Sequence, residues 1–412
     1  MNPAWLRLPL ALFWTLSLSL LWPLQDAAAA DASDLRPTRV VVLGVDHSVQ
    51  LVSEADRPGL LAAFIQRVAP DAVCIERSPE EYARGDLYEF TYEVQGVVLP
   101  YARAHRLEVC PIDWVPSRRD ELLGWGMEIS RPPEVRPAKG FQGFLAFAEP
   151  STLHRGLFHA DDRAALGKIH AWIRDVPEKL SRDLPRRMYL YRTFMQARLV
   201  AHAAKAHRGG TVLVVVGEFH KHQIEDILAD DPAIEIVQPT TFGLPERAAA
   251  ERHTTRAHRI AIASFNLLGA QAATGNVDWD WVGRVLAALE REHEDAETRL
   301  LRTRHDLLTG RIDRKEAITR YRGIAGDADA KRAFTWDGVL DRGRIDSYFD
   351  PFGNLRVDQR ARVELARELS REGASEEADG LIAALRAEVT PRQARQLDAY
   401  WRRGLAASPP PG

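Results

Sequence analysis

Between residues 38 and 240 the chain alternates short continuous apolar runs with segments of helical spacing, and this pattern restricts the fold more than any other feature. Continuous apolar runs are typical of strands that are buried on both faces, as in a parallel sheet covered by helices. A repeated order of strand, helix and strand favours an α/β fold. We therefore predict an α/β fold with a mostly parallel sheet flanked by helices.

Five segments are expected to form the strands of this sheet, with helices between them. Periodic apolar residues at 60–68 and 92–106 predict two of these helices. Another is expected after residue 217, where Ile224, Ile227 and Leu228 share a face. The expected strands are residues 40–43, 72–75, 107–112, 212–216 and 234–237.

Two further regions fall outside this alternation. Residues 115–187 show no strand pattern, and they would emerge above the sheet edge as a helical insert that acts as a lid or substrate wall. The alternative is a helical embellishment with a small core of its own. Helical spacing continues over residues 246–404, which predicts an α/β domain at 36–245 followed by a helical C-terminal domain. The tail, residues 405–412, is expected to be disordered.

The N-terminus has the pattern of a cleavable secretory signal. Arg7 precedes an uncharged apolar run at residues 8–24, and small residues follow at 27–30. Pro9 and Pro23 bound the run, and a membrane-spanning helix needs about 20 apolar residues. We expect residues 1–30 to be removed and the mature protein to work in a bacterial periplasm without a stable membrane anchor. An uncleaved anchor is the alternative.

The charge balance restricts the classes of binding partner, and the cysteine content restricts the possible disulfides. Lys and Arg number 55 and Asp and Glu 58, a balance that implies neither nucleic acid nor an anionic surface as a partner. Cys74 and Cys110 lie in two of the expected strands. In an oxidising compartment they could form a disulfide, or they could remain two small buried hydrophobic residues.

Polar side chains follow the expected strands at the points where the strands end. Because parallel strands direct their carboxyl ends to one edge of a sheet, these side chains are expected to cluster there. Gly44 and Gly217 stand at two of the exits, where glycine permits a sharp turn and a close approach of backbone to a ligand. The side chains concerned are Asp46, His47, Glu76, Asp113, Glu218 and His220.

This combination of residue types suits a divalent metal such as Mn, Co, Fe or Zn. Neutral imidazoles from His47 and His220, with the carboxylate of Glu76, form a plausible ligand set. A metal held in this way can acidify a bound water and polarise a carbonyl group. Each motif alone is a common structural feature, and their expected convergence at one sheet edge favours a functional site.

The order of four motifs resembles the TraB/GumN/Tiki superfamily over residues 38–240. They are Gly-x-x-His at 44–47, Pro-Asp-x-x-x-x-Glu at 70–76, Arg-x-x-Met at 192–195 and a second Gly-x-x-His at 217–220. Members include the Tiki metalloproteases, and erythromycin esterases and ChaN-like haem-binding proteins are relatives in the wider group. The second motif departs from the pattern, because bulky Glu218 and Phe219 replace small residues.

The resemblance implies roles for individual residues. His47 and His220 would be metal ligands or catalytic groups, and Glu76 a ligand or general base. Asp113 is the other candidate for the base that deprotonates a bound water. Arg192, expected near the start of a helix, would stabilise an anion or oxyanion.

The leading hypothesis is a periplasmic metal-dependent hydrolase that acts on a peptide, amide or ester bond of a peptide or small molecule. The alternatives are a haem- or iron-binding protein, and a non-catalytic member that acts through protein contacts of its helical half. The remaining histidines are interpreted as peripheral. His154, His159 and His170 are expected on the surface or in a lid, and His202 and His207 in solvent.

Overall fold

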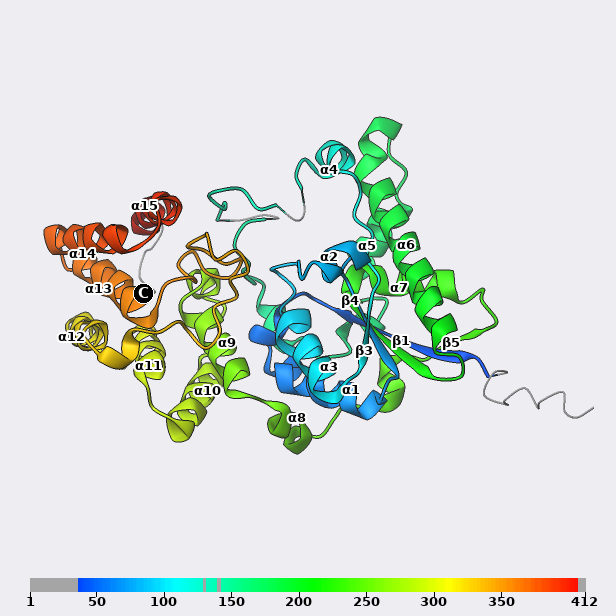
Figure 1. Ribbon diagram of the computed structural model, residues 1–412, viewed down its shortest axis with the longest axis horizontal. Helices are drawn as coiled ribbons and strands as arrows, with labels where there is room; N and C mark the ends of the chain where they lie inside the picture. The colour runs from blue at the N-terminus through cyan, green and yellow to red at the C-terminus, as the bar shows by residue number, and fades with distance from the viewer. Residues whose placement is uncertain (1–35, 129–130, 139–141, 407–412) are drawn as a thin grey trace, which may run out of the picture.

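The computed structural model describes residues 36–128, 131–138 and 142–406. Its sheet has five strands in the order β3-β2-β4-β1-β5, and every neighbouring pair is parallel (Figure 1). The predicted α/β fold with a parallel sheet is thereby confirmed. The strands are β1 (Thr38–Val45), β2 (Ala72–Ile75), β3 (Glu108–Pro111), β4 (Thr211–Gly217) and β5 (Ile234–Ile236).

The central strands explain why the apolar runs of the sequence are continuous rather than alternating. β1 and β4 pair from Arg39 with Thr211 to Val45 with Gly217. Val41, Leu43 and neighbouring strand residues of the same parity pack into one apolar core, and Val40 and Val42 pack into a second core on the opposite face. Because helices cover both faces, every side chain of β4, and every side chain of β1 after Arg39, is buried.

Two layers of helices enclose the sheet. One face is covered by α1 (Pro58–Val68) and by a π-helix at Glu93–Val98 that continues into α3 (Leu99–His105). The other face is covered by α6 (Leu184–Ala206) and α7 (Glu218–Leu228). α8 (Arg247–His253) packs beside α1 on the first face.

The insert between β3 and β4 contains no strand within its described residues, as expected. It has two short α-helices, α4 (Arg118–Trp125) and α5 (Gly167–Arg174), joined by loops and 3-10 turns. α6 begins at Leu184, two turns before Arg192, so that Arg192 lies inside the helix rather than near its start as expected. The hydrophobic spacing in that segment is weak, which hid the true start of the helix.

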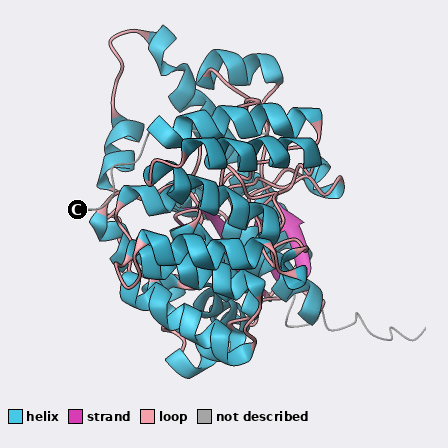
Figure 2. Cartoon of the chain, turned by 90° about the vertical axis from the view of Figure 1, so that its left-hand side faces the viewer, coloured by secondary structure: helices cyan, strands magenta, loops and turns pink. Residues whose placement is uncertain are grey.

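The C-terminal region is helical, as predicted, and Figure 2 shows its helices stacked in layers. Seven of its helices, α9 to α15, lie within the range 246–404 over which helical spacing was expected, with α15 extending to Ala406. The helices are α9 (Arg256–Leu267), α10 (Trp279–Glu292), α11 (Ala296–Leu308), α12 (Arg314–Ala325), α13 (Val357–Arg371), α14 (Ser375–Glu388) and α15 (Pro391–Ala406).

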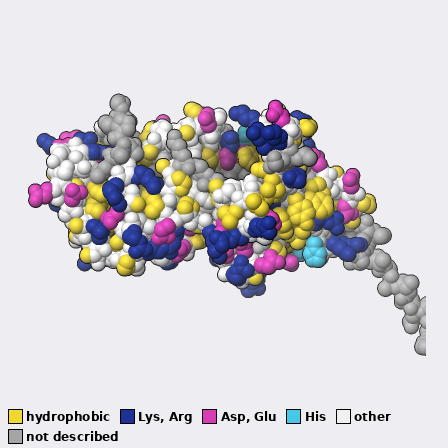
Figure 3. All heavy atoms as spheres, turned by 90° about the horizontal axis from the view of Figure 1, so that it is seen from above, with side chains coloured by type: hydrophobic (Ala, Val, Ile, Leu, Met, Phe, Trp, Pro, Cys, Tyr) yellow, Lys and Arg dark blue, Asp and Glu magenta, His cyan; other side chains and the backbone are white. Residues whose placement is uncertain are grey.

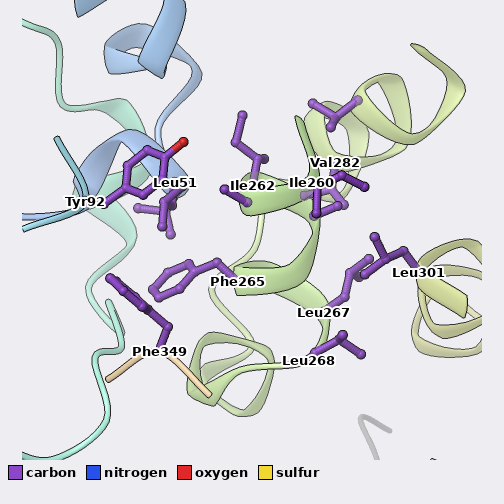
Figure 4. Close-up of a cluster of buried hydrophobic side chains, with 14 of the residues drawn as sticks. Leu51, Tyr92, Ile260, Ile262, Phe265, Leu267, Leu268, Val282, Leu301 and Phe349 are labelled. Atoms are coloured by element: carbon purple, nitrogen blue, oxygen red, sulfur yellow. The ribbon is translucent and has the colours of Figure 1, made fainter. Parts of the chain in front are cut away.

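One apolar core connects the two halves of the chain. In Figure 4, Leu51 and Tyr92 of the α/β half face Phe265 of α9, and Leu301 packs on the other side of that helix. Asn266 Nδ2 also donates a hydrogen bond to the carbonyl oxygen of Leu51 over 2.6 Å. The helical half therefore packs directly against the segment that follows β1.

The predictions for the two ends of the chain are not tested by the described residues. The expected signal at 1–30 lies outside them, as does most of the expected tail. A search of the described helices finds none with the length and apolarity that a membrane crossing requires. Cys74 and Cys110 are direct neighbours in the pairing of β2 with β3, and both thiols are free.

Candidate active site

The structure brings both predicted histidines to the same carboxylate at the carboxyl edge of the sheet. Nε2 of His47, after β1, lies 3.6 Å from Oε2 of Glu76, which follows β2. Nε2 of His220, in the first turn of α7, lies 3.7 Å from the other oxygen of Glu76. The convergence expected from parallel strands is therefore present.

The buried carboxylate of Glu93 fixes the ring of His47 through the nitrogen that does not face Glu76. Its Nδ1 is 2.7 Å from Oε1 of Glu93, whose second oxygen accepts a hydrogen bond from the backbone N–H of Ser48 at 3.1 Å. Burial opposes protonation of His47, but Glu93 and Glu76 outweigh it and raise its pKa to about 9. His47 is therefore an imidazolium at neutral pH, and its side chain is 23% exposed.

The surroundings of His220 favour the neutral ring, in contrast to those of His47. Its Nε2 lies 3.3 Å from Nη1 of Arg192, and its Nδ1 lies 2.7 Å from the Thr193 hydroxyl oxygen. Because a guanidinium only donates, Nε2 is the acceptor and Nδ1 carries the proton. Burial, together with the positive charge of Arg192, lowers the pKa of His220 to about 4 and keeps the ring neutral.

The guanidinium N–H groups of Arg192 donate hydrogen bonds to buried carboxylates of the protein. Its Nε and Nη2 donate to the two oxygens of Asp113 at 2.8 and 2.7 Å, and Nη2 also donates to Glu76 at 2.7 Å. Burial opposes ionisation of Glu76, but Arg192 and both histidines hold its pKa at about 2. Tyr88 and Gln196 complete the shell of Asp113 with hydrogen bonds of 2.7 and 2.9 Å.

The two strand-exit glycines are required by close packing. Neither has a positive φ, so the expected sharp turn is not the reason for glycine at these positions. A Cβ at Gly217 would lie 2.9 Å from Nε2 of His47 and 3.1 Å from Oε2 of Glu76. The Gly217 N–H donates to that same oxygen at 2.7 Å. At Gly44 a Cβ would lie 2.8 Å from Cβ of Ala160 in the insert.

The insert contributes a cation to the rim of this edge. Arg155 pairs with Asp46 and lies 3.4 Å from Oε1 of Glu218. Burial, with the nearby charge of Asp46, raises the pKa of Glu218 to about 7, and burial also raises that of Asp46. The insert thus contacts the rim of the site through Arg155. Its role as a lid or substrate wall stays a prediction.

The arrangement does not fit a metal ion held by His47, Glu76 and His220. The ligand atoms of these three residues do not form a group in which all lie within 4.8 Å of one another. Arg192 also occupies Oε1 of Glu76 and Nε2 of His220 with its own hydrogen bonds. A divalent ion would have to share this space with a guanidinium. The metal role of the three residues stays a prediction.

Several residues of the site were not identified from the sequence. Glu93 is the one that the sequence could most easily have indicated, because it is a carboxylate within the apolar segment that starts the helix after residue 92, and it is buried. Thr193 and Tyr88 gave no signal, since hydroxyls are common at such positions. His170, expected on the surface or in a lid, has its Nε2 3.0 Å from Nδ1 of His222.

A cleft of about 570 Å³ lies next to the site, between the loop after α2 (Pro79–Ala83) and the helical half. Tyr88 and Phe90 line it, and they also contact the site: Tyr88 bonds to Asp113, and the Phe90 ring packs edge-on at 5.2 Å from that of His47. Its polar lining includes four arginines, namely Arg84, Arg131, Arg344 and Arg392.

The region around His220 is rich in exposed apolar side chains. The Tyr189 ring stacks on the His220 ring with centroids 4.9 Å apart. Figure 3, a view from above, shows hydrophobic side chains gathered on the right-hand part of that face, among basic groups. The exposed apolar residues on the helices of this region are Leu122, Leu123, Trp172, Leu190, Tyr191, Phe194 and Phe219.

Comparisons of the chain with known protein families, with curated proteins and with solved structures return no match. The resemblance to the TraB/GumN/Tiki superfamily therefore rests on the four motifs alone.

Proposed function

We propose that this protein is a hydrolase that cleaves ester or amide bonds, peptide bonds included, by acid–base catalysis at the carboxyl edge of its sheet. The observation that carries the proposal is the pair of Glu93 and His47. A buried carboxylate fixes one nitrogen of an imidazole whose side chain is partly exposed to solvent. An acid–base group held in place by a second side chain is the arrangement that hydrolytic sites use to move protons.

His47 and Glu218 divide the proton transfers between them. Glu218, with a pKa of about 7, takes a proton from water as the water oxygen attacks the carbonyl carbon. The His47 imidazolium, with a pKa of about 9, gives its Nε2 proton to the departing oxygen or nitrogen. The products are a carboxylic acid and an alcohol or amine. Solvent then returns the proton from Glu218 to His47.

The remaining charged residues position these two groups. Glu76 faces Nε2 of His47 and stabilises the imidazolium. Arg192 fixes Glu76 and Asp113, and with its donors engaged there it acts as a positioning residue rather than as the oxyanion donor expected from the sequence. Neither proton transfer involves a metal ion, because Arg192 stands where an ion between Glu76 and His220 would lie.

The cleft beside Tyr88 and Phe90 supports a peptide or small-molecule substrate. Its volume of about 570 Å³ is within the usual range for ligand sites, and its lining combines aromatic rings with charged groups. The pattern of the N-terminal segment supports work in the periplasm. Membership of the TraB/GumN/Tiki superfamily is part of the same proposal and is supported by the motif order.

The two alternatives receive less support from the geometry. Haem ligation needs an imidazole directed at an apolar cavity, whereas the Nε2 atoms of His47 and His220 both face Glu76. A purely structural role would not require an imidazole that is both charged and 23% exposed.

The test is hydrolysis of a panel of chromogenic esters, anilides and peptides by the wild-type protein and by His47→Ala and Glu218→Gln. His202→Ala is the matched control, because His202 is an exposed histidine on α6. We expect a loss of about 100-fold or more in kcat/KM for the first two variants and none for the control. A wild-type protein inactive on the whole panel, or variants that keep full activity, would contradict the proposal.

A further inference from the structure

A second group of ligand-type side chains lies far from the active site. Glu108 and Cys110 belong to β3, an edge strand of the sheet, and His207 is the residue that ends α6. α6 carries Arg192 toward its other end, and at 1.5 Å per residue the two positions are separated by about 22 Å along the helix. The group is therefore separate from the proposed catalytic centre.

The spacing of these three side chains matches that of metal ligands. One atom each from Glu108, Cys110 and His207 lie within 4.8 Å of one another, the only such group among the described residues. Nε2 of His207 is 3.5 Å from Oε2 of Glu108. That nitrogen is buried and has no hydrogen-bond partner. A buried polar atom without a partner carries a free-energy cost, which a bound ion would remove.

The surroundings leave a sulfur ligand available. Cys74 pairs with Cys110 in the sheet and both thiols are free, so the Cys110 sulfur can bind a metal as a thiolate. His207 stands at the C-terminal end of a 23-residue helix, where the aligned peptide dipoles attract positive charge. The Glu108 side chain is 62% exposed, so an ion can enter from solvent.

We propose that Glu108, Cys110 and His207 bind one divalent cation that prefers sulfur and nitrogen ligands, of the type of Zn²⁺. Three protein ligands of mixed S, N and O character leave a fourth position for water. Hard cations such as Mg²⁺ and Ca²⁺ prefer all-oxygen sites and are not expected to bind here. A disulfide between Cys74 and Cys110 would exclude the ion, because both uses need the Cys110 sulfur.

The test is a Zn²⁺ titration of the chelator-treated, reduced full chain in competition with a coloured zinc indicator. We expect one equivalent to bind to the wild-type protein, and at least tenfold weaker binding by Cys110→Ser and by His207→Ala. The matched controls are His202→Ala, an exposed histidine on the same helix, and His47→Ala at the active site. Both should bind as the wild type does. Equal binding by Cys110→Ser and wild type, or a loss confined to His47→Ala, would overturn the proposal.

Two readouts do not depend on the folding of the variants. Co²⁺ in place of Zn²⁺ should give the wild-type protein a thiolate-to-cobalt charge-transfer absorption. Saturating Zn²⁺ should also slow the alkylation of Cys110 by iodoacetamide at least tenfold, measured by peptide mass spectrometry, whereas Mg²⁺ should not. An absent charge-transfer absorption together with unchanged alkylation would contradict the site whatever the hydrolytic activity of the protein.

Discussion

Nδ1 of His47 and Oε1 of Glu93 lie 2.7 Å apart, although 46 positions separate the two residues in the sequence. His47 leaves the end of β1, and Glu93 begins the π-helix on the adjacent face of the sheet. The contact joins a strand end to a helix start, and in the proposed mechanism the two side chains act together as one proton-transfer group.

Replacing Glu93 by Gln should therefore lower the pKa of His47. The amide can still accept a hydrogen bond from Nδ1, but the negative charge that raises this pKa to about 9 is lost. We expect the ring to titrate at least one unit lower, measured by NMR of the His47 side chain. Glu80→Gln, a change of an exposed carboxylate, is the control. An unchanged His47 pKa in Glu93→Gln would show that the pair does not set the charge of the ring.

The activity of the wild-type protein should follow a bell-shaped pH profile with a maximum between pH 7 and 9. Hydrolysis needs Glu218 ionised, with a pKa of about 7, and His47 protonated, with a pKa of about 9. A plot of kcat/KM against pH reports these two values for the free protein. Glu93→Gln should move the alkaline limb toward lower pH and leave the acid limb in place. A profile that rises continuously to pH 10 would argue against His47 as the acid.

His220 should make the fold sensitive to acid. Its pKa falls from an ordinary value of 6.5 to about 4 on folding. Between these pH values the unfolded chain therefore binds a proton at His220 that the folded protein does not bind. The contribution of the neutral ring is complete above pH 6.5 and is lost as the pH falls through this window toward 4. The loss amounts to roughly 3 kcal/mol.

The variant His220→Gln separates this effect from lost contacts. Gln cannot be protonated, so the difference in free energy of unfolding between wild type and variant should shrink on going from pH 7 to pH 4. Urea denaturation at several pH values measures it. His202→Gln, exposed on α6, should follow the wild-type curve throughout. Parallel curves for wild type and His220→Gln would mean that His220 does not remain neutral in the folded protein.

Gly217→Ala should reduce catalysis more than it reduces stability. A Cβ at this position would lie 2.9 Å from Nε2 of His47 and 3.1 Å from Oε2 of Glu76, so one of these side chains must move. A misplacement of this size in a catalytic group can cost about 100-fold in rate. Gly380→Ala, on α14 with open space around it, is the control. Unchanged kcat/KM in Gly217→Ala would indicate that His47 and Glu76 are not held in a reactive position.

The sequence predicted the elements that follow from local patterns. Continuous apolar runs located all five strands, and the rule that parallel strands share a carboxyl edge brought His47, Glu76 and His220 together. Glu93 was missed because its contact with His47 depends on how a helix packs across the sheet. Such packing leaves no periodic pattern in the sequence.

His207, at the end of α6, is a second residue whose contacts could not be predicted from the sequence. His207 was expected in solvent, as a residue that follows Arg192 on a helix. The structure places it against β3, where its side chain is only 17% exposed. Cys110 and His207 are 97 positions apart in the numbering, so no ligand spacing along the chain could have linked them.

Metal content and hydrolysis should prove to be separable properties. The proposed active site has Arg192 where a cation between Glu76 and His220 would stand, whereas Glu108, Cys110 and His207 have ligand spacing about 22 Å away along α6. Treatment with a chelator should therefore remove Zn²⁺ and leave kcat/KM unchanged. His47→Ala should abolish hydrolysis and keep one equivalent of Zn²⁺, and Cys110→Ser should do the reverse. Elemental analysis and an activity assay on the same samples measure both. If the chelator abolishes hydrolysis and His47→Ala loses the metal, then His47, Glu76 and His220 do hold a metal ion, and Arg192 must move aside to admit it.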